Sequence, residues 1–493
     1  MKVNAPRLAT VLRMGQWKRG TAVLTGGAIV AMAITYGAQI ILTRIFDASS
    51  FGIADSFVSL VAILTSFASL RYEDAIMLPE TDREASAVMG AAVALLLTTC
   101  VLLLGAVLLF GTWIGDTLGS QLLTPYLILV PLALLVHRAN ELQELWLSRA
   151  RSFGRVGSVQ VVRSSVTAGV RLTAGAAGLA ADAAGLIWGF IAGLAGSAAF
   201  LRAGSPTRRT SDRPTFADIG QALVRYRRFP LFTMPANLLG ALNTRLPFLL
   251  FLYFYSAEVV GYFGRAFVAV AIPLSLIGTA ISRVFFVAAS ESIRTGGVTA
   301  LTTKVHDRLV ALAVLPVAAI LVAGPELFEA VFGPAWPEAG RYASYLVVWF
   351  AIAGISSPLT RLFDVKERQP VDLLISLATF VLLAAALILT GRIHDIDLTL
   401  LLVGLAGAAA RTVQLATLLA IARVRLLDAL VPYLRYGLFV IPLAVGIYLT
   451  RGSGSVILLT TLSVGAILYG SLCLLSAYRA TPTTQETPTD SKN

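Results

Sequence analysis

The sequence is poor in charged residues and has little cysteine or histidine. Asp, Glu, Lys and Arg make up 13% of its 493 residues, whereas soluble chains average about 25%. Cys100 and Cys473 fall in separate apolar segments, so no disulfide framework is indicated. The three histidines lie far apart in the sequence, so we expect neither a metal site nor a cofactor. No phosphate-cradling glycine loop, nucleophile elbow or zinc motif occurs, which argues against an ATPase or a hydrolase.

Apolar residues dominate the chain instead, at 57% of the sequence. They gather into fourteen runs of roughly the 20 residues that a membrane-spanning helix needs. The short alternating segments of a β-barrel are absent. The sequence therefore predicts an all-α polytopic membrane protein with about 14 transmembrane helices. The runs are 21–42, 51–70, 86–110, 122–146, 156–180, 183–202, 229–255, 259–282, 306–323, 340–360, 370–391, 397–422, 431–450 and 453–478.

The basic residues alternate between loops. Of the 39 Lys and Arg, we assign 30 to the N-terminal tail and to every second loop, and four to the alternate loops. Because basic residues concentrate in cytoplasmic loops, this alternation predicts a protein of the cytoplasmic membrane with both termini inside the cell. Anionic membrane lipid then accounts for the net charge of +12, and no nucleic-acid partner is expected.

The longest internal polar stretch divides the predicted helices into two groups of six, with two more appended. Halves with an even number of helices start on the same side of the membrane, as in a parallel structural repeat. The predicted parts are a cytoplasmic basic tail (1–20), an N-lobe (21–202), a cytoplasmic basic linker (203–228), a C-lobe (229–422), helices 13 and 14 (431–478) and a cytoplasmic tail (479–493).

The remaining five arginines are assigned to the interior of the apolar runs, where each costs about 2.5–3.5 kcal/mol near the bilayer centre. The run 156–180 also carries polar residues at i, i+3, i+4, i+7 and i+11, which is one face of a helix. Such a face must line protein or a water-filled cavity. The arginines are Arg163, Arg171, Arg245, Arg265 and Arg411, and the polar face consists of Gln160, Arg163, Ser164, Thr167 and Arg171.

Shorter polar faces on three other runs favour one shared, hydrated cavity. One of them carries Asp55, the only acid well inside a run, and another carries Asn237. Because a guanidinium matches phosphate oxygens with two parallel bonds, a cavity rich in arginine predicts an anionic, phosphate-bearing substrate. The candidate substrate-binding residues are Arg163, Arg171, Arg245, Arg411, Arg265, Gln160, Thr167 and Asn237.

Structural roles for the same residues stay open. Arg265 lies near a helix start and could reach the membrane interface by snorkelling. Arg411 could belong to an ion pair, and Arg163 with Arg171 could hold two helices together. Asp55 could couple transport to an ion or merely neutralise one of these arginines.

Three stretches resemble a known family. They are LRYEDAIMLPETDREA at Leu70–Ala85, the segment Arg228–Phe286 with RFPLFTMPANLLGALNTRLPFLL, EVVGYFGRAF and IPLSLIGTAISRVFF, and LFEAVFGPAWPEAGRYASYLVVWF at Leu327–Phe350 followed by ISSPL. Together they resemble the polysaccharide transporter family of lipid-linked oligosaccharide flippases. That family belongs to the same superfamily as the multidrug/toxin extruders and the lipid II flippase.

The resemblance implies two six-helix lobes that rock around a central cavity, with two terminal helices. It also implies a substrate, an undecaprenyl-pyrophosphate-linked oligosaccharide, and a role in O-antigen, capsule or exopolysaccharide assembly. A polymerase and chain-length proteins of that pathway would be partners. Ser256–Ala257 stand where the family often has Gly-Pro. Two charged positions also depart from the family's usual residues: Asp55 is acidic, and Arg265 replaces an apolar or small residue.

The expected protein is therefore a flippase that works by alternating access, a transporter and not an enzyme. Arg71, Glu73 and Asp74 sit at a predicted cytoplasmic helix end, as a structural or gating motif. Two other functions stay open: a multidrug cation antiporter of the same fold, which would need acidic cavity residues, and a membrane polymerase, which would need a large external loop.

Overall fold

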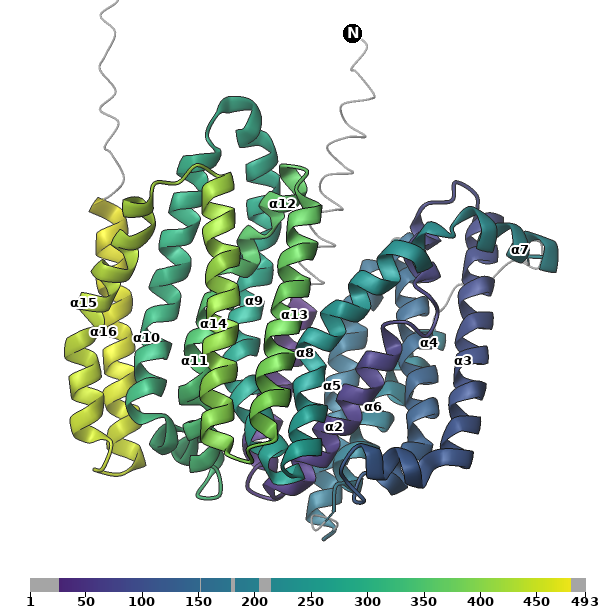
Figure 1. Cartoon of the computed structure of the whole chain (residues 1–493), viewed down its shortest axis with the longest axis horizontal. Coiled ribbons are helices and arrows are strands. Elements are labelled where there is room, and N and C mark those ends of the chain that lie inside the picture. The colour runs from purple at the N-terminus through teal and green to yellow at the C-terminus, as the bar shows by residue number, and fades with distance from the viewer. Residues whose placement is uncertain (1–25, 151, 179–181, 204–213, 480–493) are drawn as a thin grey trace, which may run out of the picture. The chain divides into compact units, whose positions relative to one another are not determined.

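The computed structural model describes residues 26–150, 152–178, 182–203 and 214–479, and these are helical throughout, with no strand (Figure 1). The predicted tail 1–20 lies outside this part of the chain, and so does the predicted tail 479–493 except for Arg479, which ends α16. The fold-class prediction is confirmed, because one long helix corresponds to each of the fourteen apolar runs. The long helices are Gly26–Leu42, α2 (Ala48–Thr65), α3 (Asp82–Thr117), α4 (Val130–Arg149), α5 (Phe153–Ala176), α6 (Ala184–Arg202), α8 (Met234–Phe254), α9 (Ala257–Thr295), α10 (Val298–Phe332), α11 (Pro337–Leu359), α13 (Gln369–Gly391), α14 (Ile396–Ile421), α15 (Leu426–Thr450) and α16 (Ser455–Arg479).

Nine of these helices, counted within the described residues, are long and apolar enough to cross a membrane. Four of the others, α4, α5, α8 and α9, carry the charged residues discussed below. Short helical segments join the long ones. They are η1 (Tyr72–Met77), η2 (Thr124–Leu129), α7 (Phe216–Arg225), η5 (Phe229–Thr233) and α12 (Arg361–Val365).

The chain divides into two compact units. Unit 1 contains residues up to Arg265 together with Ser376–Val403, and unit 2 contains Ala266–Ile375 with the chain from Gly404 onward. Helix α8, which falls in the predicted C-lobe, therefore belongs to unit 1 with the helices of the predicted N-lobe. Because α9 starts in unit 1 and ends in unit 2, the units do not follow the sequence halves, and the two-lobe division stays a prediction.

Helix α2 forms the centre of unit 1. Phe51 and Phe57 are buried there, 2% and 0% exposed. The start of α9 crosses α2 closely, because neither helix has a side chain at the contact: a Cβ on Gly52 would overlap the carbonyl of Ala257, and a Cβ on Gly261 would overlap the carbonyl of Ala48. Small residues at helix contacts allow such an approach. This crossing positions the residues that follow Gly261.

The polar linker contains a helix that docks on unit 1. Helix α7 lies by the beginning of α3 (Figure 1) and starts with a capping box at Thr215, the cap that satisfies free backbone amides. Arg83 of α3 pairs with Asp218 at 3.0 Å, and the Tyr72 hydroxyl donates to the Leu223 carbonyl at 2.8 Å. The segment predicted as a linker, 203–228, thus contains an ordered helix in its second half. Residues 204–213 lie outside the described part.

The Asp218 carboxylate should make this docking sensitive to acid. Hydrogen bonds from the Thr215 amide, Arg83 and the Thr215 hydroxyl hold the pKa of Asp218 below its ordinary value. A carboxylate with a lowered folded-state pKa stabilises above its unfolded pKa, and the contribution is lost as pH falls through the folded value. We expect Asp218→Asn to increase backbone hydrogen exchange across α7 at neutral pH and to remove its acid sensitivity. Unchanged exchange in the variant would contradict this role.

Unit 2 is built around α10 and α11. Helices α15 and α16 pack on α10, where Phe285, Leu359, Phe363 and Tyr436 are buried. The Tyr469 hydroxyl of α16 donates to the Ala311 carbonyl of α10 at 2.7 Å. The two terminal helices are therefore an integral part of this unit's core.

Candidate functional site

Asp55 is the centre of a cationic cluster in unit 1. Its Oδ2 lies 2.7 Å from Nη2 of Arg265, which comes from the start of α9. The contact depends on Gly264, because a Cβ at that position would overlap the Asp55 carboxylate. The two charged positions that depart from the family's usual residues therefore form one ion pair.

Arg265 is buried, with 2% of its surface exposed. Its guanidinium carbon stacks 4.1 Å above the Phe51 ring, in the geometry of a cation–π contact. The Nε and Nη1 donors have no hydrogen-bond partner among the described residues. The side chain does not snorkel to a surface in this structure. A buried guanidinium with two unused donors is costly unless another group fills them.

Two more arginines lie in the electrostatic field of Asp55. They are Arg171 of α5, which also faces Arg265, and Arg245 of α8. Arg171 donates through Nε to the Leu186 carbonyl at 3.0 Å. Arg245 lies over the Phe248 ring at 6.0 Å. Three guanidiniums around one carboxylate leave an excess of two positive charges, so the site attracts anions.

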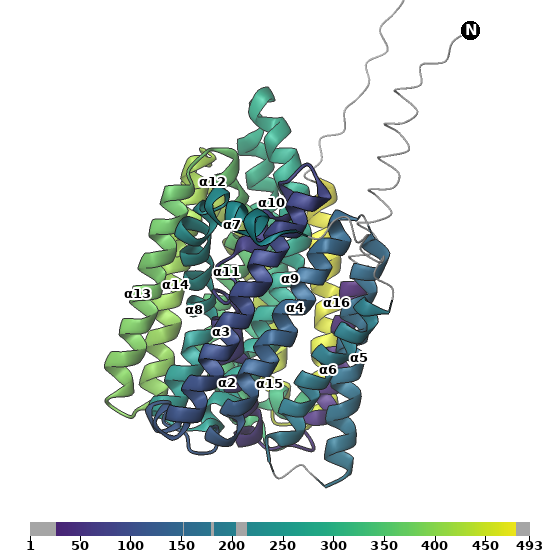
Figure 2. The same ribbon diagram turned by 90° about the vertical axis from the view of Figure 1, so that its right-hand side faces the viewer.

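The polar face of α5 is divided between two neighbourhoods. Helices α5 and α6 run side by side (Figure 2), and the glycines of α6 make room for the α5 side chains. A Cβ on Gly189 would overlap Arg171, and one on Gly193 would overlap Thr167. Arg163, two helical turns before Arg171, instead pairs with Glu144 of α4 at 2.8 Å. The glycine row thus positions polar residues as well as allowing close packing.

The other predicted residues are not gathered at Asp55. Gln160 is exposed, and Asn237 donates to the Thr233 carbonyl in the preceding helical turn at 2.9 Å. Ser164 accepts a hydrogen bond from Thr35 at 3.3 Å, so the polar faces of the first helix and α5 do meet.

Arg411 lies in unit 2 in a cluster of its own. Its Nη1 donates to Oε1 of Gln414 at 2.7 Å, and the Gln414 amide donates to Asp372 at 3.4 Å. Its buried Nε has no partner in the described part of the chain. The residues Gln414 and Asp372 were not predicted, although i and i+3 spacing places Gln414 beside Arg411.

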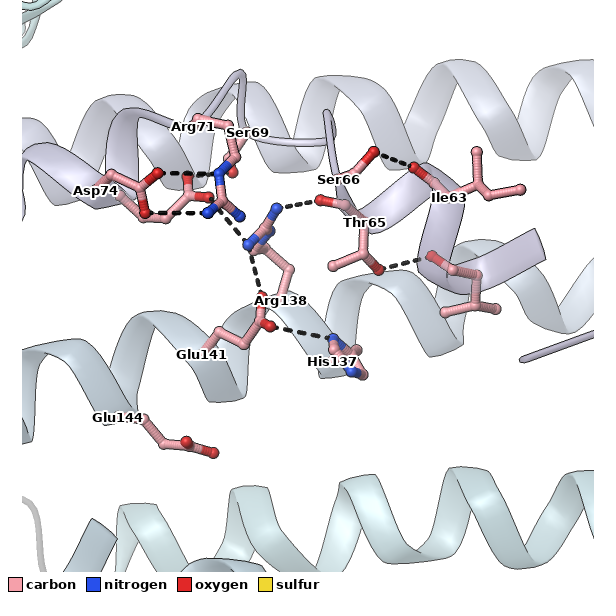
Figure 3. Close-up of polar contacts among 12 residues, drawn as sticks. Ile63, Thr65, Ser66, Ser69, Arg71, Asp74, His137, Arg138, Glu141 and Glu144 are labelled. Carbon is pink, nitrogen blue, oxygen red and sulfur yellow. Dashed lines mark hydrogen bonds and ion pairs between the residues drawn. The ribbon is translucent and has the colours of Figure 1, made fainter. Parts of the chain in front are cut away.

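An extended ion network follows α2 (Figure 3). Glu73 lies in η1, is 1% exposed, accepts from the Ser69 hydroxyl at 2.5 Å and pairs with Arg138 of α4 at 3.0 Å. Arg71 lies 3.4 Å from Glu73 and 3.0 Å from Asp74. The three residues predicted as a structural or gating motif thus share one network, and Glu73 is buried where a solvated residue was expected.

The backbone of this network is strained. Leu70 and Arg71 both have a left-handed conformation, with φ of 49° and 61°, which costs roughly 1–2 kcal/mol for a residue with a Cβ. The turn carries the chain from α2 into η1, where Glu73 pairs with Arg138. The ion pairs therefore hold a turn that the local sequence does not favour.

The ionisable residues of α4 were missed in the sequence. Arg138, which the loop assignment included, lies inside α4 and is 1% exposed. It also pairs with Glu141 at 2.6 Å, and His137 Nδ1 lies 3.9 Å from Glu141. The spacing of His137, Arg138, Glu141 and Glu144 is i, i+1, i+4 and i+7, which indicates one helix face. This spacing in the sequence could have identified the four residues as one ionisable helix face.

Unit 2 also has an apolar groove between α15 and α16. It has a volume of about 420 Å³, and its lining includes Leu443, Ile457, Val464 and Leu468. Few polar atoms line it, so it suits a hydrocarbon chain.

The close crossing at Asp55 can be tested by overfilling it. Gly261→Ala should lower the unfolding free energy by about 1–3 kcal/mol, because the new methyl group meets the Ala48 carbonyl. Gly240→Ala in α8 is the matched control, since a Cβ there has nothing within 4 Å. Thermal unfolding of the purified variants compares them. Equal melting temperatures would contradict the packing described.

Comparisons with known proteins agree on the fold. A family model described as "Polysaccharide biosynthesis protein" matches residues 41–341. No curated protein sequence matches the chain. The lipid II flippase MurJ, in an inward closed conformation, has a TM-score of 0.69 at 12% identity, covering 93% of this chain and 99% of that structure. An inward-facing multidrug resistance MATE transporter has a TM-score of 0.58 at 13% identity, covering 80% and 99%. A MOP superfamily transporter from Pyrococcus furiosus has a TM-score of 0.54 at 13% identity, covering 83% and 97%.

The chain is therefore a multi-pass membrane protein with the fold of the MOP superfamily transporters. It belongs to the polysaccharide biosynthesis protein family, whose model covers well over half of its length. The predicted resemblance is confirmed. The proteins that share the fold are transporters and flippases, in agreement with the prediction of a transporter.

Proposed function

We propose that the protein flips an undecaprenyl-pyrophosphate-linked oligosaccharide across the cytoplasmic membrane by alternating access. The observation that carries the proposal is the Asp55 cluster. Arg265 is buried with two unused donors, and Arg171 and Arg245 add positive charge beside it. A pyrophosphate would satisfy those donors with charge-assisted bonds, which are the strong class of hydrogen bond.

The two remaining parts of such a substrate have separate requirements. A polyprenyl tail is apolar and stays in the hydrocarbon of the bilayer. The sugars are hydrophilic and require water or polar groups along their path. Arg163 and Arg411 are candidate contacts for acidic sugars. Family membership in polysaccharide biosynthesis supports a glycan substrate, and the fold shared with the lipid II flippase supports a lipid carrier.

The proposal includes an orientation and partners. Both termini lie in the cytoplasm, and the glycolipid moves from the cytoplasmic to the outer leaflet. The positive charge of alternate loops supports this orientation. A polymerase and chain-length proteins would use the product on the outer side. A C-terminal fusion to a reporter that works only in the cytoplasm should be active, and a fusion to a reporter that works only outside the cytoplasm should be inactive. Activity of the second fusion would contradict the orientation.

A deletion strain tests the function. Loss of the protein should accumulate single lipid-linked repeat units in the inner leaflet, where added glycosidases cannot reach them in intact spheroplasts. Accumulation in the outer leaflet would instead indicate a polymerase. Increased sensitivity to cationic drugs with normal glycan display would indicate a drug antiporter; one protein of the same fold is named a multidrug resistance transporter. Either result would overturn the proposal.

A further inference from the structure

The Arg163 side chain lies in a second ionic cluster, separate from the Asp55 cluster. Helix α4 presents His137, Glu141 and Glu144 along one face, and Arg163 reaches that face from α5. Arg163 lies eight residues before Arg171 in α5, or about 12 Å away along the helix axis. The Arg163 Nε also faces the Ser197 hydroxyl of α6 at 3.4 Å. Three helices therefore surround one guanidinium.

The Glu144 carboxylate is the only acid that pairs directly with Arg163 among the described residues. The pair is partly accessible, since the side chains are 28% (Arg163) and 20% (Glu144) exposed. Ligands can therefore reach it, unlike the buried Glu73–Arg138 pair, whose side chains are 1% exposed.

The charges around Glu144 favour its protonation once Arg163 is withdrawn. Glu141 acts on Glu144 as a like charge, and Glu141 is itself held by Arg138 at 2.6 Å. Arg163 is the cation acting on Glu144, and His137 responds to Glu141, Arg163 and Arg138. Without Arg163, Glu144 would be an ionised carboxylate in a low-dielectric site beside a second carboxylate, and such a group takes up a proton.

We propose that Arg163 is a second oxyanion-binding site and that Glu144 is its displaceable counter-ion. The inference rests on the proposed transport of a pyrophosphate-linked glycan. In the empty protein, Glu144 neutralises Arg163. A phosphate or an acidic-sugar carboxylate takes its place, and Glu144 then accepts one proton from water. Charge balances, because one bound anion enters with one proton, and release of the anion releases the proton.

Each of the other titratable groups that face Glu144 is less suited to take up the proton that accompanies anion binding. Glu141 and His137 lie on its own helix, Arg138 is held by Glu73, and Arg163 faces it from α5. Within the described residues, α6 contributes the neutral Ser197 to this cluster. Displacement by an anion breaks the Glu144 pair and leaves the Arg138–Glu141 pair in place.

Isothermal titration of the full-length protein in nanodiscs tests the proposal, with farnesyl pyrophosphate as the probe. Titrations in buffers of different ionisation enthalpy give the protons taken up per bound ligand. We expect wild-type affinity to fall by up to about tenfold per pH unit as pH rises from about 5.5 to about 8. The pH dependence of the Glu144→Gln affinity should be weaker by up to about tenfold per pH unit, because only the ligand's own titration remains in the variant.

The protons that the ligand itself takes up are the same for the wild type and for Glu144→Gln. The difference between the two proteins therefore gives the proton uptake of Glu144 alone. His137→Gln should keep the wild-type proton uptake. Glu338→Gln is the matched control, since it removes the acid of an exposed pair with Arg341 in unit 2 and should leave binding unchanged. Glucuronate in place of the pyrophosphate distinguishes a sugar carboxylate from a phosphate as the preferred anion.

The outcomes separate this inference from the proposed function. Wild-type proton uptake in Glu144→Gln, or its loss in His137→Gln, would overturn the assignment of Glu144 and leave the flippase proposal standing. Absence of farnesyl pyrophosphate binding in the wild type would overturn both. If Arg163→Ala still binds farnesyl pyrophosphate and takes up as many protons as the wild type, the proton binds at another site. That result would also overturn the inference.

Discussion

Arg265→Ala should abolish surface display of the glycan at an unchanged protein level. A hydrogen bond between charged groups is worth about 1.5–3 kcal/mol, and two such bonds to a phosphate correspond to a loss of at least about 100-fold in binding. Arg265→Lys should rescue only partly, because an ammonium cannot replace the planar fork that reaches Asp55 and a phosphate together. Immunoblotting of the displayed glycan against the protein level gives the measurement.

Arg83→Ala is the matched control for this experiment. Arg83 also pairs with an aspartate of unit 1, but its side chain is 60% exposed, so its pair should contribute no more than about 1 kcal/mol. Display should stay close to normal in Arg83→Ala. Normal display in Arg265→Ala would refute the assignment of the Asp55 cluster as the substrate site.

The largest loss of stability is expected for Arg138→Ala. This substitution removes the closer of the two cations that pair with Glu73 and leaves Arg71 at 3.4 Å. Both side chains of the lost pair are 1% exposed, and breaking a buried pair costs about 3–5 kcal/mol. It also releases the left-handed turn at Leu70 and Arg71 from its anchor. Thermal unfolding followed by fluorescence-detected size exclusion should show a large decrease in melting temperature.

The double variant Glu73→Leu with Arg138→Leu separates lost charge balance from lost packing. Replacing both members of a buried pair with apolar residues is often neutral or stabilising. We therefore expect the double variant to recover much of the stability that Arg138→Ala loses. Equal losses in the two variants would mean that the network stabilises by packing alone. If the network also serves as a gate, the stable double variant should still fail to transport.

The sequence predicts the helices well because the signal for a membrane span is long and redundant. All fourteen apolar runs correspond to long helices, although their ends shift, as at α3, which continues past the predicted residue 110 to Thr117. The end of the linker was harder to predict. Phe216–Arg225 is too short to stand out, and its helix depends on a cap at Thr215 and on ion pairs with α3 that only the fold creates.

The arginines inside the runs were found and Asp55 was named as a possible counter-charge, but the sequence did not indicate which arginine Asp55 pairs with. Arg265 and Asp55 are 210 residues apart, and nothing local to either position indicates the pair. The polar face of α5 suggests one cavity, yet Arg163 and Arg171 belong to different clusters because α4 supplies Glu144 to only one of them. The α4 residues were overlooked because they lie toward the end of the run 122–146, and Arg138 was counted with the adjoining loop although it falls within that run.

The most direct test of the account is a flipping assay with purified protein in liposomes. A fluorescent polyprenyl-pyrophosphate oligosaccharide is placed in both leaflets, and its access to an external quencher or glycosidase is followed over time. The account predicts rapid access to nearly all of the glycolipid with the wild-type protein, and access to only the outer half with Arg265→Ala. Equal flipping by the two proteins, or none by the wild type, would contradict it.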